Sequence, residues 1–283
     1  MNFTVIVRSI GERTESLCLQ AIRREFSGPI YIIKNISPPY EVYLKNFQTL
    51  IESREKWGIC IDADIILMKN WRKIIENNIE NISSDQFFSI TFNTQDYLSG
   101  KKLYRGIHIY NRLYAQLCYN FMCCNKEIIQ TSIKNHILNK HFITKQESSL
   151  VSYFNLLGIQ LYLSSDTIAY HAYEQYYHEF FRQYAVRAQR DKDNPSQLLE
   201  YRNNLQHLFT KTKNTDFKVG LLGIKHFDLF NHITDIQKLR EEISLFLKNE
   251  YNILEKDPIT LTLDKFYNIY SEGNLKKIFK LFT

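Results

Sequence analysis

The chain is poor in glycine and proline, with 9 Gly and 5 Pro among 283 residues, so it is neither a collagen-like repeat nor a flexible linker. Its apolar content of 44% is too high for an intrinsically disordered chain. No stretch of about 18 consecutive apolar residues occurs, so the sequence predicts no membrane-spanning helix. These absences favour a globular protein of one large domain, or of one domain with an extension.

Five cysteines are present, but none forms the CxxC pairs that structural zinc sites use. Positive charge is in slight excess, since 36 basic against 30 acidic residues give a net charge of +6. This excess suits an anionic substrate and is too small to predict nucleic-acid binding. No basic segment precedes the first apolar run, so we expect no signal peptide and predict a cytoplasmic protein.

Short apolar runs alternate with amphipathic stretches over the first two thirds of the chain. The predicted strands cover 3–7, 30–33, 57–61, 87–92, 106–110, 160–163 and 167–170. The predicted helices between them cover 14–26, 43–51 and 146–157. This alternation predicts an α/β fold with a mixed, mainly parallel sheet flanked by helices.

The last third of the chain has helical periodicity, beginning with an aromatic-rich helix expected over 173–190. We therefore predict an α/β catalytic domain over residues 1–190 and a helical C-terminal extension over 191–283. Near the chain end, one helical face beside three lysines carries Leu275, Ile278, Phe279 and Phe282. Such a helix suits peripheral contact with an anionic membrane and ordinary packing equally well.

Two carboxylates follow the third predicted strand directly, in the sequence Asp62-Ala63-Asp64. Mg²⁺ and Mn²⁺ prefer carboxylate, water and phosphate oxygens, so this pair is a candidate metal site that can bridge to a diphosphate. A D-x-D pattern is most often a solvated loop, but apolar runs frame this one on both sides. His171 also ends a predicted strand and is a candidate further ligand, although a hydrogen-bonded, partly buried histidine is the simpler interpretation.

Glu147 lies in the first turn of the helix predicted over 146–157. It is either a favourable charge at a helix N-terminus or a general base that deprotonates an acceptor hydroxyl. Arg105 and Tyr110 bound a strand-like segment that is a candidate acceptor-binding surface or an ordinary strand.

The order and spacing of these motifs resemble the family 2-type, GT-A-fold (Rossmann-like) nucleotide-sugar glycosyltransferases of the DxD type, over residues 3–190. The first strand ends in the polar, acidic loop Val7-Arg8-Ser9-Ile10-Gly11-Glu12, and the basic-Asn pair Lys45-Asn46 precedes the Asp62-Ala63-Asp64 motif. The family's acidic helix, glycine and histidine are similar to Gln146-Glu147-Ser148-Ser149-Leu150, Gly158 and His171.

The resemblance implies a hexosyltransferase-type enzyme that moves one sugar from a nucleotide-diphosphate donor, with a UDP-sugar expected, to a hydroxyl of a glycan or lipid-linked acceptor. It implies that Asp64 and His171 bind Mn²⁺ or Mg²⁺, that Asp62 contacts the ribose or the ion, and that Glu147 is the base of an inverting transfer. The implied donor-binding residues are Val7, Arg8, Ser9, Glu12, Lys45, Asn46 and Asp62.

Two departures from the family keep alternatives open. Gln146-Glu147 stands where an acid followed by Asp is usual, and Lys34-Asn35-Ile36-Ser37 offers no acidic residue for the nucleotide base. A retaining transferase on the same fold, or a non-catalytic sugar-nucleotide or glycan-binding module, are the alternatives. A composition rich in Asn, Ile, Lys and Tyr is typical of AT-rich bacterial genomes, which fits surface polysaccharide or lipooligosaccharide synthesis at the inner membrane face.

Overall fold

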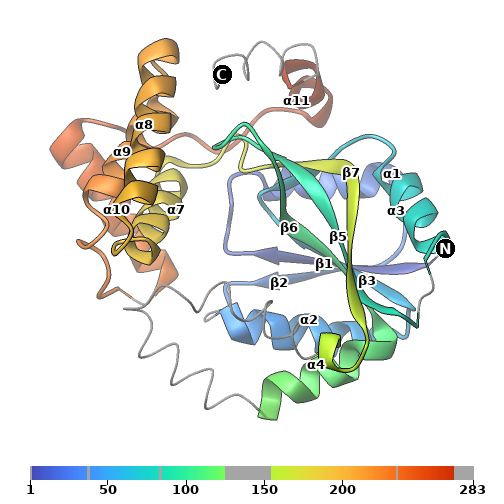
Figure 1. The fold of residues 1–283 in the computed structure, drawn as a ribbon. Helices are drawn as coiled ribbons and strands as arrows, with labels where there is room; N and C mark the ends of the chain where they lie inside the picture. Colours follow the sequence, from blue (N-terminus) through green and yellow to red (C-terminus); the bar gives the residue numbers. More distant parts are fainter. Residues whose placement is uncertain (1, 37–38, 83–84, 125–153, 234, 271–283) are drawn as a thin grey trace. The chain divides into compact units, whose positions relative to one another are not determined.

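A computed structural model of the chain describes residues 2–36, 39–82, 85–124, 154–233 and 235–270. The chain divides into two compact units, an α/β unit that ends at Tyr173 and a helical unit from Glu174 onward. In Figure 1 the α/β unit is coloured from blue to yellow and the helical unit from yellow to red. Within the described ranges, no helix has the length and apolar character needed to cross a membrane.

The α/β unit is built on a seven-stranded mixed sheet with the strand order β2-β1-β3-β6-β5-β7-β4. The strands are β1 (Phe3–Ser9), β2 (Ile30–Lys34), β3 (Trp57–Asp62), β4 (Ile65–Leu67), β5 (Phe87–Asp96), β6 (Lys102–Asn111) and β7 (Gln160–His171). The pairs β1–β2, β1–β3 and β5–β7 are parallel, whereas β3–β6, β5–β6 and β4–β7 are antiparallel. The predicted α/β class is confirmed.

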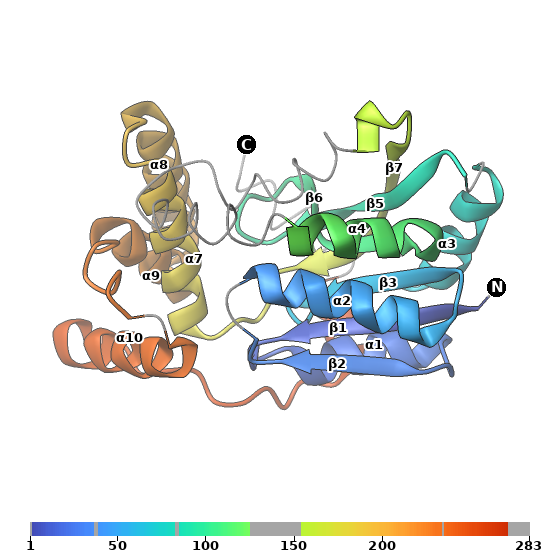
Figure 2. The same ribbon diagram turned by 90° about the horizontal axis from the view of Figure 1, so that it is seen from below.

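In the part of the chain that the structure describes, the helices that flank this sheet are α1 (Glu15–Glu25), α2 (Pro39–Ser53), α3 (Trp71–Glu80) and α4 (Arg112–Cys124). In Figures 1 and 2, α2 and α4 cover one face of the sheet and α1 and α3 lie on the other. The apolar positions that predicted α1 and α2 pack on the sheet, whereas α3 and α4 were not predicted from the sequence. Beneath α2 and α4 the core includes Ile6, Phe47, Leu50, Cys60 and Phe88.

β7 is one strand of 12 residues, where the sequence predicts two short strands. The polar residues at the centre of β7 interrupt the apolar pattern, but side chains of neighbouring elements form hydrogen bonds with them. Asn78 of α3 accepts a hydrogen bond from the Ser164 hydroxyl, and the Asn93 amide of β5 lies 3.4 Å from the Ser164 carbonyl oxygen. β5 is likewise longer than predicted, and its extension ends at Asp96.

The helical unit contains α7 (Tyr177–Arg190), α8 (Pro195–Thr212), α9 (Thr215–Lys225), α10 (Ile236–Tyr251) and α11 (Leu263–Ile269). α7 packs mainly against α9, and its aromatic residues Phe180 and Phe181 are fully buried, so these two residues serve packing. A Cβ atom on Gly223 of α9 would lie 2.3 Å from the Phe181 carbonyl oxygen, which explains a glycine there. Because α7 belongs to this unit, the division falls after Tyr173, earlier than the boundary expected after residue 190.

Candidate functional site

The ends of three neighbouring strands bring two carboxylates to one histidine. β7 runs between β5 and β4, and the register sets His171 opposite both Asp96 of β5 and Ile65 of β4. Asp64 directly precedes β4, and its Oδ2 lies 3.4 Å from Nε2 of His171. On the other side of the ring, Nδ1 lies 2.5 Å from Oδ1 of Asp96. The structure therefore brings the predicted pair Asp64 and His171 together and adds Asp96 to it.

This group is largely removed from solvent. The side chain of Asp96 is fully buried, and those of His171 and Asp64 are 11% and 14% exposed. Burial alone would lower the pKa of His171, but the charge of Asp64 and the hydrogen bond and charge of Asp96 outweigh it, and the pKa is raised. The positive charge of Arg105 opposes this rise in the pKa of His171, so the guanidinium acts electrostatically on the same imidazole.

Hydrogen bonds from three segments hold the turn that carries the two aspartates. The Ala63 N–H donates to the Arg8 carbonyl at 2.9 Å, and the Thr14 hydroxyl donates to the Ala63 carbonyl at 3.0 Å. The Ala172 N–H donates to the Asp64 carbonyl at 3.1 Å, although Ala172 itself has a φ of 60°. A buried non-glycine residue persists in that left-handed region only where its surroundings fix it. The carboxylate of Asp64 thus projects from a rigid turn.

Asp62 forms an ion pair with Arg8 of β1, with 2.8 Å between Oδ1 and Nε. The Arg8 guanidinium also lies over the ring of Tyr43 on α2, 5.4 Å from its centroid. Burial alone would lower the pKa of Arg8, but the charge of Asp62 raises it well above its ordinary value. Arg8 therefore remains a cation beside the aspartate pair.

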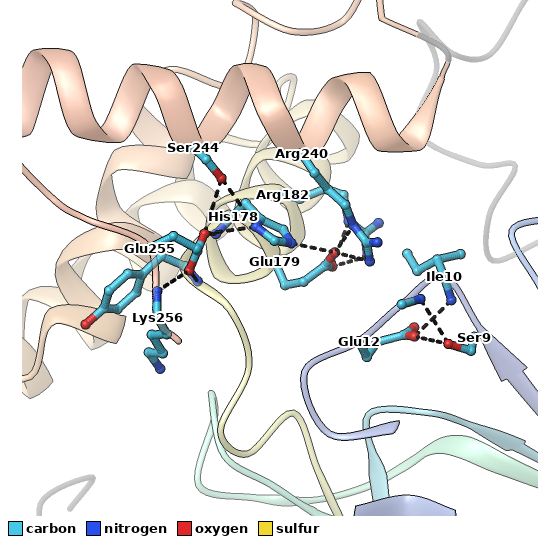
Figure 3. A network of polar contacts seen from close by, with 12 residues as sticks. Ser9, Ile10, Glu12, His178, Glu179, Arg182, Arg240, Ser244, Glu255 and Lys256 are labelled. Atoms are coloured by element: carbon cyan, nitrogen blue, oxygen red, sulfur yellow. Dashed lines mark hydrogen bonds and ion pairs between the residues drawn. The ribbon is translucent and has the colours of Figure 1, made fainter. Parts of the chain in front are cut away.

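The β1–α1 loop is organised by its own polar side chains (Figure 3). The Ile10 N–H and the Ser9 hydroxyl both lie 2.9 Å from Oε2 of Glu12, and the Ser9 hydroxyl also contacts Glu15. Glu15 is paired in turn with Lys34 at the end of β2. Ser9 and Glu12, predicted to contact the donor, therefore also fix the shape of the loop that follows β1.

The other residues predicted to bind the sugar donor, Val7, Lys45 and Asn46, differ in how far they are buried. Val7 is fully buried on β1, so its side chain belongs to the core. Lys45 is exposed on α2, whereas Asn46 is fully buried, and neither polar atom of its amide has a hydrogen-bond partner. The structure does not bring Lys45 and Asn46 together as one binding pair, because they occupy different sides of the helix.

Of the two predicted acceptor residues, Tyr110 is 4% exposed and packs edge-on against Phe47, with 5.0 Å between ring centroids. This burial opposes direct contact with an acceptor. Arg105 instead acts on His171. Glu147, predicted as the general base, lies outside the described residues, as do most of the helix expected over 146–157 and the C-terminal face over 275–282.

Asp64 and His171 suit a divalent cation. Asp96 occupies Nδ1, so Nε2 faces Asp64, and a separation of 3.4 Å lets both atoms bind one ion at the roughly 2.1 Å that Mg²⁺ adopts. Asp62, engaged by Arg8, does not complete a third position. Across the described ranges, no group of three or more His, Cys, Asp or Glu is arranged to hold a metal ion. Mg²⁺ bound by one or two carboxylates takes its other ligands from substrate phosphates and water, so two protein ligands are sufficient.

The sequence does not predict Asp96 as a site residue, because the strand expected over 87–92 ends four residues earlier. Phe92, Thr94 and Asp96 are all buried at alternate positions of β5. Two of these three are polar, however, so hydrophobic alternation does not reveal the longer strand. The in-register pairing of Asp96 with His171 becomes visible only in the folded sheet.

No family model and no curated protein matches the chain. Among solved structures it is similar to a glycosyltransferase involved in the glycosylation of the major capsid of PBCV-1, with a TM-score of 0.40 and 11% identity over 60% of this chain and 93% of that chain. It is also similar to the glycosyltransferase GlyE of Streptococcus pneumoniae TIGR4, with a TM-score of 0.35 and 13% identity over 58% of this chain and 45% of that chain. For S. aureus TarS 1-349 the TM-score is 0.33 and the identity 10%, over 81% and 92% of the two chains. These TM-scores are low, so the likenesses carry no conclusion about activity.

Proposed function

We propose that the α/β unit is a glycosyltransferase that uses a nucleotide-diphosphate sugar and a divalent cation. The observation that carries this proposal is the approach of Asp64 to His171, which are 107 positions apart in the chain (171 − 64) and 3.4 Å apart in space. The site lies where β3, β5 and β7 end, and open α/β sheets bind their ligands beyond the carboxyl ends of strands.

Different residues of the site would bind different parts of the nucleotide-sugar donor. Asp64 and His171 would hold Mn²⁺ or Mg²⁺, and a bound ion of this kind neutralises charge that develops on a diphosphate leaving group. Arg105 adds a positive charge near His171 and can serve the same diphosphate. Asp62, 38% exposed while paired with Arg8, has a second oxygen that can accept a hydrogen bond from the donor ribose.

The acceptor side of the proposal depends on Glu147, which retains the role that the family resemblance implies. A carboxylate on the face of the sugar opposite the diphosphate would deprotonate the acceptor hydroxyl and give inversion. Glu147→Gln should then reduce turnover by about 10²–10⁴-fold while donor affinity stays near that of the wild type. A product that retains the donor's anomeric configuration would replace this mechanism with the retaining alternative.

Calorimetric titration of nucleoside diphosphates and nucleotide sugars, with and without Mn²⁺, tests the donor site. We expect the wild-type chain to bind one nucleotide in an Mn²⁺-dependent manner and Asp64→Asn to lose at least about 100-fold in affinity. Asp166→Asn is the matched control, because Asp166 is an exposed carboxylate of the same unit that pairs with Asn78. Equal affinity in Asp64→Asn and the wild type, or binding that needs no metal, would contradict the proposal.

A further inference from the structure

We propose that Asp96 is a positioning residue for His171. Its carboxylate, oriented by the backbone N–H of Ser99, holds the imidazole in the tautomer whose Nε2 lone pair faces Asp64 and a bound divalent cation. The cation comes from the proposed function, so the inference deepens that proposal and rests on it.

The two carboxylate oxygens of Asp96 have separate partners. Oδ1 lies 2.5 Å from Nδ1 of His171, while Oδ2 accepts the Ser99 N–H at 2.8 Å and the Ser99 hydroxyl at 2.6 Å. The backbone of Asp96 is also fixed, because its N–H donates to the Lys101 carbonyl and its carbonyl accepts from the Gly100 N–H. The fully buried carboxylate is therefore held in one orientation.

This orientation determines where the imidazole carries its hydrogen. An ionised carboxylate only accepts hydrogen bonds, so Nδ1 of His171 must be the donor toward Asp96. In the neutral ring Nε2 is then the acceptor, which is the form that binds metal ions. A carboxylate behind a ligating histidine fixes the tautomer and ring orientation in many metal sites. The Tyr97 N–H bond to the His171 carbonyl, at 3.0 Å, anchors the backbone of the histidine.

Asp96→Asn should reverse the tautomer with little change in shape. The Ser99 backbone N–H can only donate, so the single oxygen of the new amide must face Ser99. The amide nitrogen then faces His171 and donates to Nδ1, which must become the acceptor. Nε2 carries the hydrogen instead and presents it toward Asp64, where it excludes a cation. The same exchange of Asp for Asn behind a catalytic histidine gives the wrong tautomer in serine proteases.

Nitrogen NMR of the full chain labelled at its 8 histidines tests this directly, at one alkaline pH where the imidazoles are neutral. The His171 signals are those missing from a His171→Gln spectrum. We expect the Nδ1–H form in the wild type and in Ser99→Ala, which keeps the backbone donor, and the Nε2–H form in Asp96→Asn. Mn²⁺ affinity measured by electron paramagnetic resonance should fall about 10–100-fold in Asp96→Asn and remain unchanged in Ser99→Ala.

The Nε2–H form in the wild type would overturn the inference, and this readout needs no folded variant. The Nδ1–H form in Asp96→Asn, or a reversed tautomer with unchanged Mn²⁺ affinity, would overturn it as well. Failure of the proposed function gives a different result: the wild type would bind no Mn²⁺, and the cation role would fall, while the tautomers would still follow the expected pattern.

Discussion

Each unit of the chain contains a histidine between two carboxylates, and the surroundings of the two differ. In the α/β unit, His171 lies between Asp96 and Asp64. In the helical unit, Nδ1 of His178 lies 2.9 Å from Glu255 Oε2, and Nε2 lies 3.6 Å from Glu179 Oε1 (Figure 3). Similar geometry therefore occurs at a candidate site and inside a helical bundle.

The negative charge of Glu179 is balanced by two arginines of its own unit. Arg240 donates to its Oε1 at 2.8 and 3.0 Å, and Arg182 donates to its Oε2 at the same two distances. Burial alone would raise the pKa of Glu179, but the charges of Arg182, Arg240 and His178 lower it to about 2. This carboxylate joins α7 to α10 through its contacts with Arg240.

Glu255 has a comparable structural role at the start of α7. It accepts the N–H groups of Tyr177 and His178 at 2.6 and 3.0 Å, which are among the donors that a helix N-terminus leaves unsatisfied. Burial alone would raise the pKa of Glu255, but the hydrogen bonds from His178 and the backbone lower it to about 2.

The difference lies in the sign of the charge around each histidine. In the helical unit, arginines and backbone donors stabilise the carboxylates in their charged form. In the α/β unit, negative charge dominates around the imidazole, and the pKa of His171 is raised despite burial and the opposing charge of Arg105. An arrangement of that kind attracts a further cation, whereas the arrangement around His178 is already balanced.

Glu179→Gln should have the largest effect on stability. Removing one partner of a buried ion pair leaves uncompensated charge on Arg240 and costs about 3–5 kcal/mol. Denaturant unfolding followed by far-ultraviolet circular dichroism reports both units, whereas tryptophan fluorescence reports the α/β unit, which holds both Trp57 and Trp71. We expect the circular dichroism transition to show a lower free energy of unfolding, while nucleotide affinity stays unchanged. A loss of nucleotide affinity would remove the distinction between the arrangements around His171 and His178.

The two units should respond to pH in opposite directions. Glu179 and Glu255 have a folded-state pKa of about 2, below the value of about 4.3 in unfolded chains, so they stabilise the helical unit above pH 4.3. That stability, on the order of 3 kcal/mol for Glu179, is lost as pH falls toward 2. The pKa of His171 is raised in the folded state, so its protonated form stabilises the α/β unit below about pH 6.5. This contribution is lost as pH rises through the folded-state pKa of His171.

Urea unfolding from pH 3 to pH 9, read by the same two signals, measures both responses. In His171→Gln the alkaline loss should disappear from the fluorescence transition, while the acid loss in circular dichroism should remain. An alkaline loss of equal size in that variant would assign the response to another group.

Two glycines with left-handed φ test the packing behind the aspartate turn. At Gly106, with φ +68°, a Cβ would lie 2.6 Å from Ile65 Cδ1 and 3.5 Å from Asp62 Oδ2. At Gly158, with φ +73°, a Cβ would meet no atom within 4 Å. Gly158→Ala should cost about 1 kcal/mol from backbone strain, and Gly106→Ala about 2–4 kcal/mol because overpacking adds to it. Equal melting temperatures for the two variants would show that the turn is not tightly packed.

The sequence predicted β1, β2, β3, α1, α2 and α7 in their observed order, but it did not predict β4, α3 or α4. The strands from Phe3 to Ile61 are apolar runs between breakers, so they were predictable from periodicity alone. The centre of β7 and the end of β5 were not, because their buried positions include Ser164 and Asp96, whose polar groups are satisfied by other elements.

The candidate site, like the fold, was predictable from the sequence only in part. Asp64 and His171 were identified because each follows an apolar run, and the order of motifs linked them. Burial of Tyr110 and the ion pair between Arg8 and Asp62 depend on neighbouring strands and on α2, which periodicity does not specify.

Replacing each histidine by glutamine in turn tests the central comparison most directly. His171→Gln should lose about 100-fold in Mn²⁺-dependent affinity for the nucleoside diphosphate that the wild type binds. His178→Gln should keep that affinity and lose about 1–3 kcal/mol of unfolding free energy in the helical unit, because Glu255 loses a charge-assisted partner. Unchanged affinity in His171→Gln, or an equal loss in His178→Gln, would contradict the assignment of the donor site to the α/β unit.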